Sequence, residues 1–300
     1  MINASHLIKR FNSFTAVNDV TLNVDKGQIF GLLGPNAAGK TTVIRMLCGI
    51  LECDGGEIRL NDKTVNKAKT DFGYVAQHFG QYEELSVREN LQFYARMYEV
   101  DDEQWLSSLL DRYALSSFKD QRAGTLSGGY KRRLALACAL AHEPEILFLD
   151  EPTAGIDPLT RKLLWDDFYR LSTEGKTLFV TTHYMEEAQR CHHLAFLSAG
   201  QIVAEGSPES IKHALNNASV YSTCIPYLPE LREALVKMEG MILVNQFGHE
   251  LRLVVSPVID KSDLETAIQT ITGKPPSLHL SEPNLEDVFI ALTQEQPVKP

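Results

Sequence analysis

The chain has 300 residues, of which 44% are hydrophobic and 23% are charged. These values are typical of an ordinary globular protein with about two domains. The net charge of −10 argues against general nucleic-acid binding, because neutralising phosphates needs a basic surface. No stretch approaches the roughly 18 apolar residues of a membrane-spanning helix, and the N-terminus lacks a signal-peptide pattern. The composition therefore favours a cytoplasmic protein.

Short apolar segments in the first two thirds of the chain predict strands. Those at 146–149 and 178–180 are continuously apolar, which is typical of parallel strands covered by helices on both faces. Residues 86–142 lack such segments and indicate a helical insert. The pattern predicts an α/β domain over 1–215, with a parallel core sheet and a helical subdomain at about 86–142. The predicted strands are 17–24, 28–33, 57–60, 72–77, 146–150, 177–182 and 194–197.

The order of predicted strands and helices changes near residues 216–218. Beyond this point the sequence predicts strands at 220–225, 241–245, 251–256 and 277–280, and helices at 228–238, 260–270 and 284–292. The order up to the fourth strand is βαββαβ, which is that of a small α+β domain of the ferredoxin-like type. We expect this second domain to cover residues 219–296.

A phosphate-binding loop stands at residues 34–42, which read Gly-Pro-Asn-Ala-Ala-Gly-Lys-Thr-Thr. The segment matches G-x-x-x-x-G-K-[ST] between a predicted strand and a predicted helix. Backbone N–H groups and the positive end of the helix dipole attract phosphates, Lys40 adds a full charge, and the Thr41 hydroxyl can bind Mg²⁺. The pattern predicts a nucleoside triphosphate ligand, bound by Gly34, Pro35, Asn36, Ala37, Ala38, Gly39, Lys40, Thr41 and Thr42.

Ala37 stands where many such loops have another glycine. Its Cβ either fits an ordinary backbone with negative φ or strains the loop, since glycine alone tolerates positive φ freely. We expect nucleotide binding to survive with modest weakening.

Further segments narrow the class of protein. Leu-Ser-Gly-Gly-Tyr at 126–130 precedes an apolar helix, an apolar strand ends in Asp150-Glu151, and Thr-Thr-His at 181–183 follows another apolar strand. With Ala-Gly-Ile-Asp at 154–157 and Gln77 after a strand, this order resembles the ATP-binding-cassette (ABC) ATPases over nearly all of residues 1–210. A phosphate-loop fold, ATP and Mg²⁺ are what the resemblance implies.

The resemblance implies catalytic roles for Glu151, His183 and Gln77. Asp150 ends a buried strand beside the phosphate loop, where it can hold the Mg²⁺ shell together with Thr41 and Gln77. Glu151 matches the family's general base, which polarises the attacking water. His183 matches the residue that touches the γ-phosphate, and Gln77 matches the one that senses Mg²⁺ and water. The plainer alternative for Asp150-Glu151 is an acidic end to the strand.

A second subunit follows from the same resemblance. Ser127, Gly128 and Gly129 stand at a helix N-terminus and present N–H groups to an anion. In the family this surface meets the γ-phosphate held by the opposite subunit, which implies a head-to-tail homodimer with two ATP molecules. Asp157 matches the loop that crosses that interface.

Three positions leave alternatives open. Phe11 stands where the family places an adenine-stacking ring, and Phe14 is its competitor. Tyr130 replaces the commoner glutamine, with an unknown effect on turnover. The basic triplet 131–133, Lys-Arg-Arg, is interpreted as a solvated helix face. The more specific functional alternative is that it binds a partner or anionic lipid.

The expected partner is a separate transmembrane permease, because the chain has an ATPase pattern and no membrane span. In the family, residues 73–82 receive the permease's coupling helices, and Asn-Leu-Glu-Asp-Val-Phe at 284–289 resembles the drug, polysaccharide and sodium exporter branch. We expect an exporter ATPase, peripheral on the inner face of the cell membrane and in contact with the membrane only through the permease. Alternatives are a non-transport ABC ATPase and a weakly hydrolysing regulatory subunit.

Overall fold

The computed structural model describes residues 1–215 and 218–294 and divides into two compact units, Met1–Ile202 and Val203–Pro300. The division falls earlier than the expected domain end at 215. The reason is that helix α7 (Pro208–Lys212) packs against α10 (Leu285–Gln294) within the second unit. Part of the expected linker, 216–217, and the last two residues of the expected domain, 295–296, lie outside the described residues.

A six-stranded sheet with the order β10-β9-β3-β8-β7-β6 forms the centre of the first unit. The pairs from β9 to β6 are parallel, and their register places Leu33 beside Thr182 and Asp150 beside Thr181. The carboxyl ends of β3, β7 and β8 therefore meet at one edge. The strands are β3 (Ile29–Leu33), β6 (Phe72–Val75), β7 (Ile146–Asp150), β8 (Thr177–Thr182), β9 (His193–Ser198) and β10 (Gln201–Gly206).

A second sheet has the order β2-β1-β4-β5 and is antiparallel. One hydrophobic cluster joins residues of β1 and β2 to Val43 and Leu47 of α1 (Lys40–Leu47), and to Phe30 and Phe148 of the parallel sheet. The burial of these side chains holds the phosphate loop, which precedes α1, against the edge of the parallel sheet. The strands are β1 (Ile2–Phe11), β2 (Phe14–Val24), β4 (Gly55–Leu60) and β5 (Lys63–Thr64).

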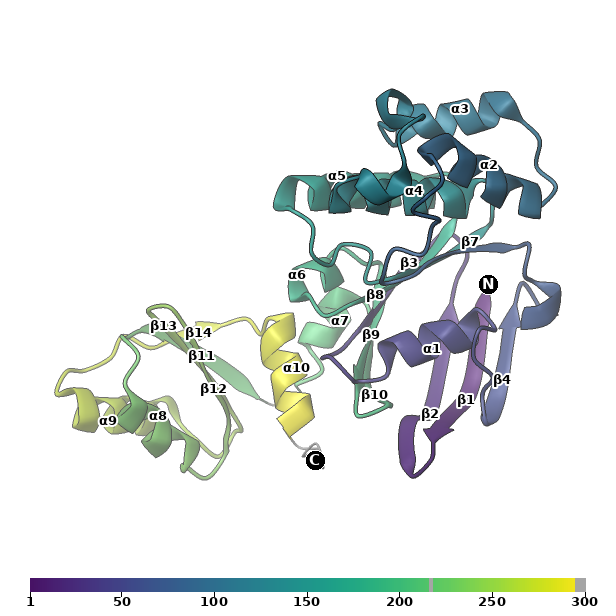
Figure 1. Cartoon of the computed structure of the whole chain (residues 1–300). Coiled ribbons are helices and arrows are strands. Elements are labelled where there is room, and N and C mark those ends of the chain that lie inside the picture. The colour runs from purple at the N-terminus through teal and green to yellow at the C-terminus, as the bar shows by residue number, and fades with distance from the viewer. Residues whose placement is uncertain (216–217, 295–300) are drawn as a thin grey trace. The chain divides into compact units, whose positions relative to one another are not determined.

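The helical insert contains α2 (Val87–Met97), α3 (Glu103–Arg112) and α4 (Gly128–Leu140), which lie together at one end of the first unit (Figure 1). A capping box starts α2: Ser86 accepts from the Glu89 N–H, and the Glu89 carboxylate accepts from the Ser86 N–H. Two more helices, α5 (Pro158–Thr173) and α6 (Met185–Ala188), follow β7 and β8. Within the described residues, no helix has the length and apolar character to cross a membrane.

The predicted strands recur. Those at 146–150 and 177–182 keep their ends, and the other strands of the first unit have shifted ends. β1, β5 and β10 were not predicted, although the buried side chains of β1 partly alternate with exposed ones. β6 ends at Val75 rather than at Gln77, because the carbonyls of Ala76 and Gln77 accept hydrogen bonds from Arg132.

The second unit has the succession β11-α8-β12-β13-α9-β14-α10, and its antiparallel sheet has the order β12-β13-β11-β14. Up to β14 this is the succession of a split βαβ domain. A buried ion pair between Arg252 and Asp287 ties β13 to α10, with 2.6 Å between Nη2 and Oδ2. The remaining elements are β11 (Ser219–Cys224), α8 (Pro229–Val236), β12 (Met241–Phe247), β13 (Glu250–Val255), α9 (Lys261–Thr272) and β14 (His279–Ser281).

Candidate active site

The phosphate loop joins β3 to α1 and closes around Lys40. Gly39 precedes α1 with φ of 107°, and a Cβ there would lie 2.6 Å from the carbonyl oxygen of Ala16. Only glycine fits that position. The Lys40 ammonium is buried and donates to the carbonyls of Gly34 (2.9 Å) and Pro35 (3.1 Å). The loop therefore carries one full positive charge at its centre.

A cavity of about 390 Å³ lies over this loop. It brings together seven of the fourteen expected nucleotide-binding residues with Gln77 and Glu151, which come from distant parts of the chain. Phe11 and Phe14 both line it, and both are exposed, by 45% and 62%. The two residues are partners in the β1–β2 register, and both line the cavity, so neither is excluded as the ring that stacks on a base. The lining is completed by Ala16, Asn36, Ala37, Gly39, Lys40, Thr41 and Thr42.

Asp150 is fully buried at the end of β7. Its Oδ1 accepts from the hydroxyls of Thr181 (2.7 Å) and Thr41 (3.3 Å), whereas Oδ2 has no hydrogen-bond partner among the described residues. Burial raises the pKa of this carboxyl, partly offset by the two hydroxyl donors. A buried carboxylate oxygen beside the Thr41 hydroxyl fits a hard cation such as Mg²⁺, whose ligands in proteins are oxygens.

Glu151 is the point at which the remaining polar side chains converge. Its carboxylate is buried and lies 3.2 Å from the Lys40 ammonium, 3.2 Å from the Gln77 amide nitrogen that donates to it, and 3.3 Å from Nδ1 of His183. The His183 contact has the distance of an ion pair but not the geometry of a hydrogen bond. The structure thus brings the three expected catalytic residues together.

The backbone of Glu151 is unusual, with φ of 45°. Left-handed backbone costs a non-glycine residue about 1–2 kcal/mol and persists only where its surroundings hold it. Three contacts do so: the Glu151 N–H donates to the Thr181 hydroxyl (2.9 Å), and the Glu151 carbonyl accepts from Arg132 (3.1 Å) and from the Ala154 N–H (3.2 Å). The turn aims the carboxylate at the cavity instead of along the strand.

Arg132 corrects the interpretation of the basic triplet as a solvated face. Its guanidinium is buried and donates to the carbonyls of Ala76 (2.8 Å), Gln77 (3.0 Å) and Glu151 (3.1 Å). Burial lowers the pKa of Arg132, opposed by the two nearby carboxylates. One side chain on α4 therefore holds two segments of the site. The missed signal is the helical period, because Arg132 shares a face with the buried Leu136 four residues on.

A second buried carboxylate, Glu187 on α6, was also missed. It accepts from the hydroxyls of Thr153 and Thr182, the latter at 2.7 Å, and lies 3.6 Å from Arg161. These contacts tie the loop after β7 to the end of β8, immediately before His183. Nothing in the local sequence pattern separates Glu187 from its exposed neighbour Glu186.

Ser127, Gly128, Gly129 and Asp157 do not line the phosphate-loop cavity. Ser127 precedes α4 without a side-chain cap, and a Cβ on Gly128 would meet nothing within 4 Å. A Cβ on Gly129 would lie 3.4 Å from Thr160, whose N–H donates to Asp157 (2.9 Å). Hydrogen bonds from the side chain and the N–H of Thr160 lower the pKa of Asp157. The starts of α4 and α5 therefore lie side by side, apart from the phosphate loop.

Comparisons with known proteins agree with this geometry. The ABC transporter family model matches residues 17–154. The Nod factor export ATP-binding protein I of Burkholderia thailandensis is 37% identical, and the alignment covers 95% of this chain and 94% of that protein. The probable multidrug ABC transporter ATP-binding protein YbhF of Escherichia coli K12 is 40% identical, and that alignment covers 71% of this chain. The same alignment covers only 38% of YbhF, so this chain matches less than half of that protein.

A solved structure of an ATP-binding subunit of an ABC transporter superposes with a TM-score of 0.66 at 27% identity. The superposition covers 71% of this chain and 92% of the solved chain. The phosphate-loop α/β fold and the resemblance drawn from the motifs are both confirmed. The chain belongs to the ABC transporter family of ATP-binding proteins.

Proposed function

We propose that this chain is the ATP-hydrolysing subunit of an ABC exporter. The observation that carries the proposal is the convergence of Lys40, Gln77 and His183 on the Glu151 carboxylate beside the phosphate-loop cavity. The two relatives are named for multidrug transport and for Nod factor export, which supports export as the direction of transport.

The cavity suits a nucleoside triphosphate. The loop amides and the start of α1 bind the phosphates, and Lys40 exchanges its contacts with loop carbonyls for phosphate oxygens. Phe11, or else Phe14, stacks on the adenine. Thr41, Asp150 and Gln77 would hold Mg²⁺, which neutralises phosphate charge when it is bound. Among the described residues no cluster of three or more His, Cys, Asp or Glu forms a metal site.

Glu151 acts as the general base. A water placed between its carboxylate and the γ-phosphate gives a proton to Glu151 as its oxygen attacks phosphorus. The bond between phosphorus and the bridging oxygen of ADP breaks in the same step, which releases ADP and phosphate. Gln77 and His183 hold the carboxylate and the water in line, and the left-handed turn at Glu151 sets the direction of approach.

A second copy of the chain completes the site. Ser127, Gly128, Gly129 and Asp157 lie together outside the phosphate-loop cavity, so the anion-binding start of α4 is free to face the γ-phosphate held by another subunit. ATP would then join two subunits in a head-to-tail homodimer, and closure of that dimer would drive the partner. Hydrolysis at Glu151 would reopen it.

The partner we propose is a separate membrane permease. A cavity of about 320 Å³ lies between the core and the helical insert. It is lined by Tyr94 and Tyr98 of the α2 region and, from the expected segment 73–82, by Gly73, Tyr74, Ala76, His78, Gly80 and Gln81. Tyr82 and Phe93 stand beside it with exposed rings in edge contact. An apolar cavity of this kind suits a helix end of a permease, and binding there would hold the chain at the inner face of the membrane.

The decisive variant is Glu151→Gln, which removes the base but keeps a side chain of the same size. Light scattering with saturating ATP and Mg²⁺ should show a stable dimer, whereas the wild type returns to monomer as ATP is consumed. Lys40→Ala is the control and should lose ATP binding and dimerisation. A Glu151→Gln protein that stays monomeric refutes the two-subunit site, and undiminished binding by Lys40→Ala refutes the phosphate-loop assignment. Co-purification with ribosomes rather than with a membrane protein would refute export.

A further inference from the structure

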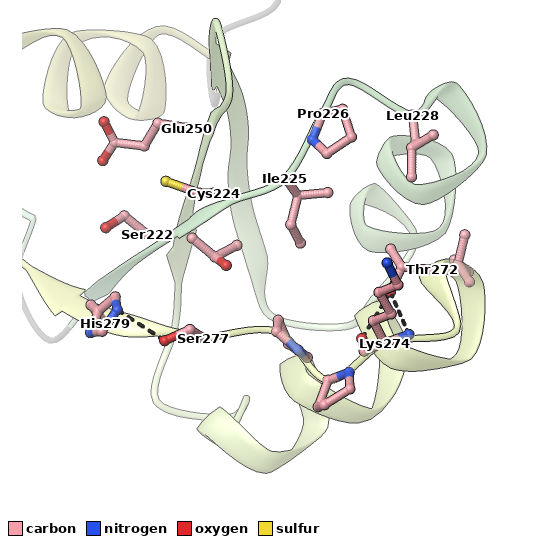
Figure 2. Close-up of a pocket in the computed structure, with 14 residues that line it drawn as sticks. Ser222, Cys224, Ile225, Pro226, Leu228, Glu250, Thr272, Lys274, Ser277 and His279 are labelled. Carbon is pink, nitrogen blue, oxygen red and sulfur yellow. Dashed lines mark hydrogen bonds between the residues drawn. The ribbon is translucent and has the colours of Figure 1, made fainter.

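The second unit contains a groove of about 650 Å³ that has no place in ATP hydrolysis. One wall is the end of β11 and the chain that follows it, from Ser222 to Leu228. The other wall is the segment from the end of α9 to the start of β14, at 272–279. Figure 2 shows the two walls separating beyond the point at which Ser222 and His279 face each other.

The exposed edge of β11 forms the first wall. β14 pairs with β11 at Val220, Tyr221 and Ser222 and then ends. The N–H of Ile225 donates to His249 on the opposite side, so the N–H and C=O of Cys224 point into the groove, because neighbouring residues of a strand face opposite ways. Within the described part of the chain, neither group of Cys224 has a backbone hydrogen-bond partner.

The chain's own sequence keeps this edge open. The residue that would pair with Cys224 in the β14 register is Ser277, and it is preceded by Pro275 and Pro276, which have no N–H to donate. Thr272 and Lys274 close a turn between themselves, in which the Thr272 hydroxyl donates to the Lys274 carbonyl at 2.9 Å. The second wall therefore bends away from β11 and leaves room for another strand.

Lys274 supplies a cation at one end of the groove and forms no ion pair among the described residues. Glu250, at the other end, lies 3.5 Å from Arg252, which it shares with Asp287. Ile225, Leu228 and Ile271 supply apolar surface between them. A ligand that matches this pattern has a carboxylate near Lys274, apolar side chains along the middle, and backbone groups for Cys224.

We infer that this groove binds an extended acidic peptide segment of a partner protein, which adds a strand to the open edge of β11. Backbone hydrogen bonds to Cys224 provide the pairing, and the carboxylate facing Lys274 provides selectivity. An open strand edge is a ready template for such pairing, and the local cation selects an acidic sequence although the whole chain is acidic.

The test uses the full chain and a fluorescein-labelled heptapeptide of alternating valine and threonine with a central aspartate. Fluorescence anisotropy measures its Kd. Cys224→Pro removes the N–H that faces the groove without removing a ladder bond to β13, and Cys224→Ser is the matched control that keeps it. We expect Cys224→Ser to bind as the wild type does, and Cys224→Pro to bind about tenfold more weakly or worse. Lys274→Glu should reverse the preference toward a peptide with a central lysine.

A change in the peptide keeps the test valid if Cys224→Pro does not fold. N-methylation of one set of alternate amides should abolish binding, and N-methylation of the other set should leave it, because only one set faces β11. Equal effects of the two sets, or unchanged binding by folded Cys224→Pro, would overturn strand addition and leave a cavity for small organic acids. Failure of the aspartate peptide to bind at about 1 mM would also overturn the inference.

Discussion

Replacing Arg132 tests how the fold positions the catalytic carboxylate. The guanidinium donates to the carbonyls of Ala76, Gln77 and Glu151, but Arg132 does not itself line the phosphate-loop cavity. Arg132 is therefore a positioning residue rather than a catalytic one. Arg132→Ala removes all three donors at once, so the segment that carries Gln77 and the turn at Glu151 lose their common anchor.

The expected size of the effect follows from these contacts. A buried carbonyl left without a donor costs about 1–3 kcal/mol. The Ala76 and Gln77 carbonyls lose their donor, whereas the Glu151 carbonyl keeps the Ala154 N–H, so the free energy of unfolding should fall by about 2 kcal/mol or more. The left-handed turn at Glu151 loses one of its three supports. A displacement of the carboxylate by about 1 Å lowers kcat by about 100-fold. KM for ATP should stay nearly constant, because Lys40 and the loop are not in contact with Arg132.

The assay is phosphate release under saturating ATP and Mg²⁺, with thermal unfolding measured on the same samples. Arg133→Ala is the matched control, because this neighbour is half-buried and stacks on Tyr130 at 5.2 Å instead of reaching the site. Arg132→Lys should recover part of kcat through the donors that an ammonium retains. The reasoning fails if folded Arg132→Ala keeps kcat within about threefold of the wild type, or if Arg133→Ala lowers kcat as much.

Three further predictions concern the nucleotide cavity. Ala37 has φ of 64°, so Ala37→Gly should raise the free energy of unfolding by up to about 1 kcal/mol. The affinity for ATP should change less than about tenfold. A larger gain in affinity would mean that the backbone strain at Ala37 opposes ATP binding itself. Burial raises the folded-state pKa of Asp150, so the ionised carboxylate lowers the stability of the fold above that pKa, and this loss disappears as pH falls below the pKa of the unfolded state. Asp150→Asn should therefore raise Tm at neutral pH and lose this increase in Tm near pH ~4. The same variant should lose Mn²⁺ binding measured by paramagnetic resonance. An unchanged or lower Tm at neutral pH contradicts this. Phe11→Ala should weaken binding of a fluorescent ATP analogue by about tenfold and Phe14→Ala by much less, and the reverse order would assign the stacking ring to Phe14.

Local patterns in the sequence determined the chemistry of the first unit. The glycine and lysine spacing of the phosphate loop needs only a preceding strand and a following helix, and both are encoded nearby. The continuously apolar segments before Asp150 and Thr182 predict parallel strands, and parallel strands that end together bring Asp150, Glu151 and His183 to one edge. These inferences depend on periodicity and spacing, which a single sequence displays.

The tertiary structure alone decided how those residues are held. Whether Arg132 is solvated or buried depends on the packing of α4 against the segment after β6, and that packing involves residues more than fifty positions away. The same holds for Glu187, whose partners come from three elements, and for the positive φ of Glu151 and Ala37, which the surrounding contacts impose. The open edge of β11 likewise depends on where β14 stops pairing. The sequence alone determined which chemical groups are present, and only the folded chain decided which of them meet, because burial and backbone strain are set by contacts between distant segments.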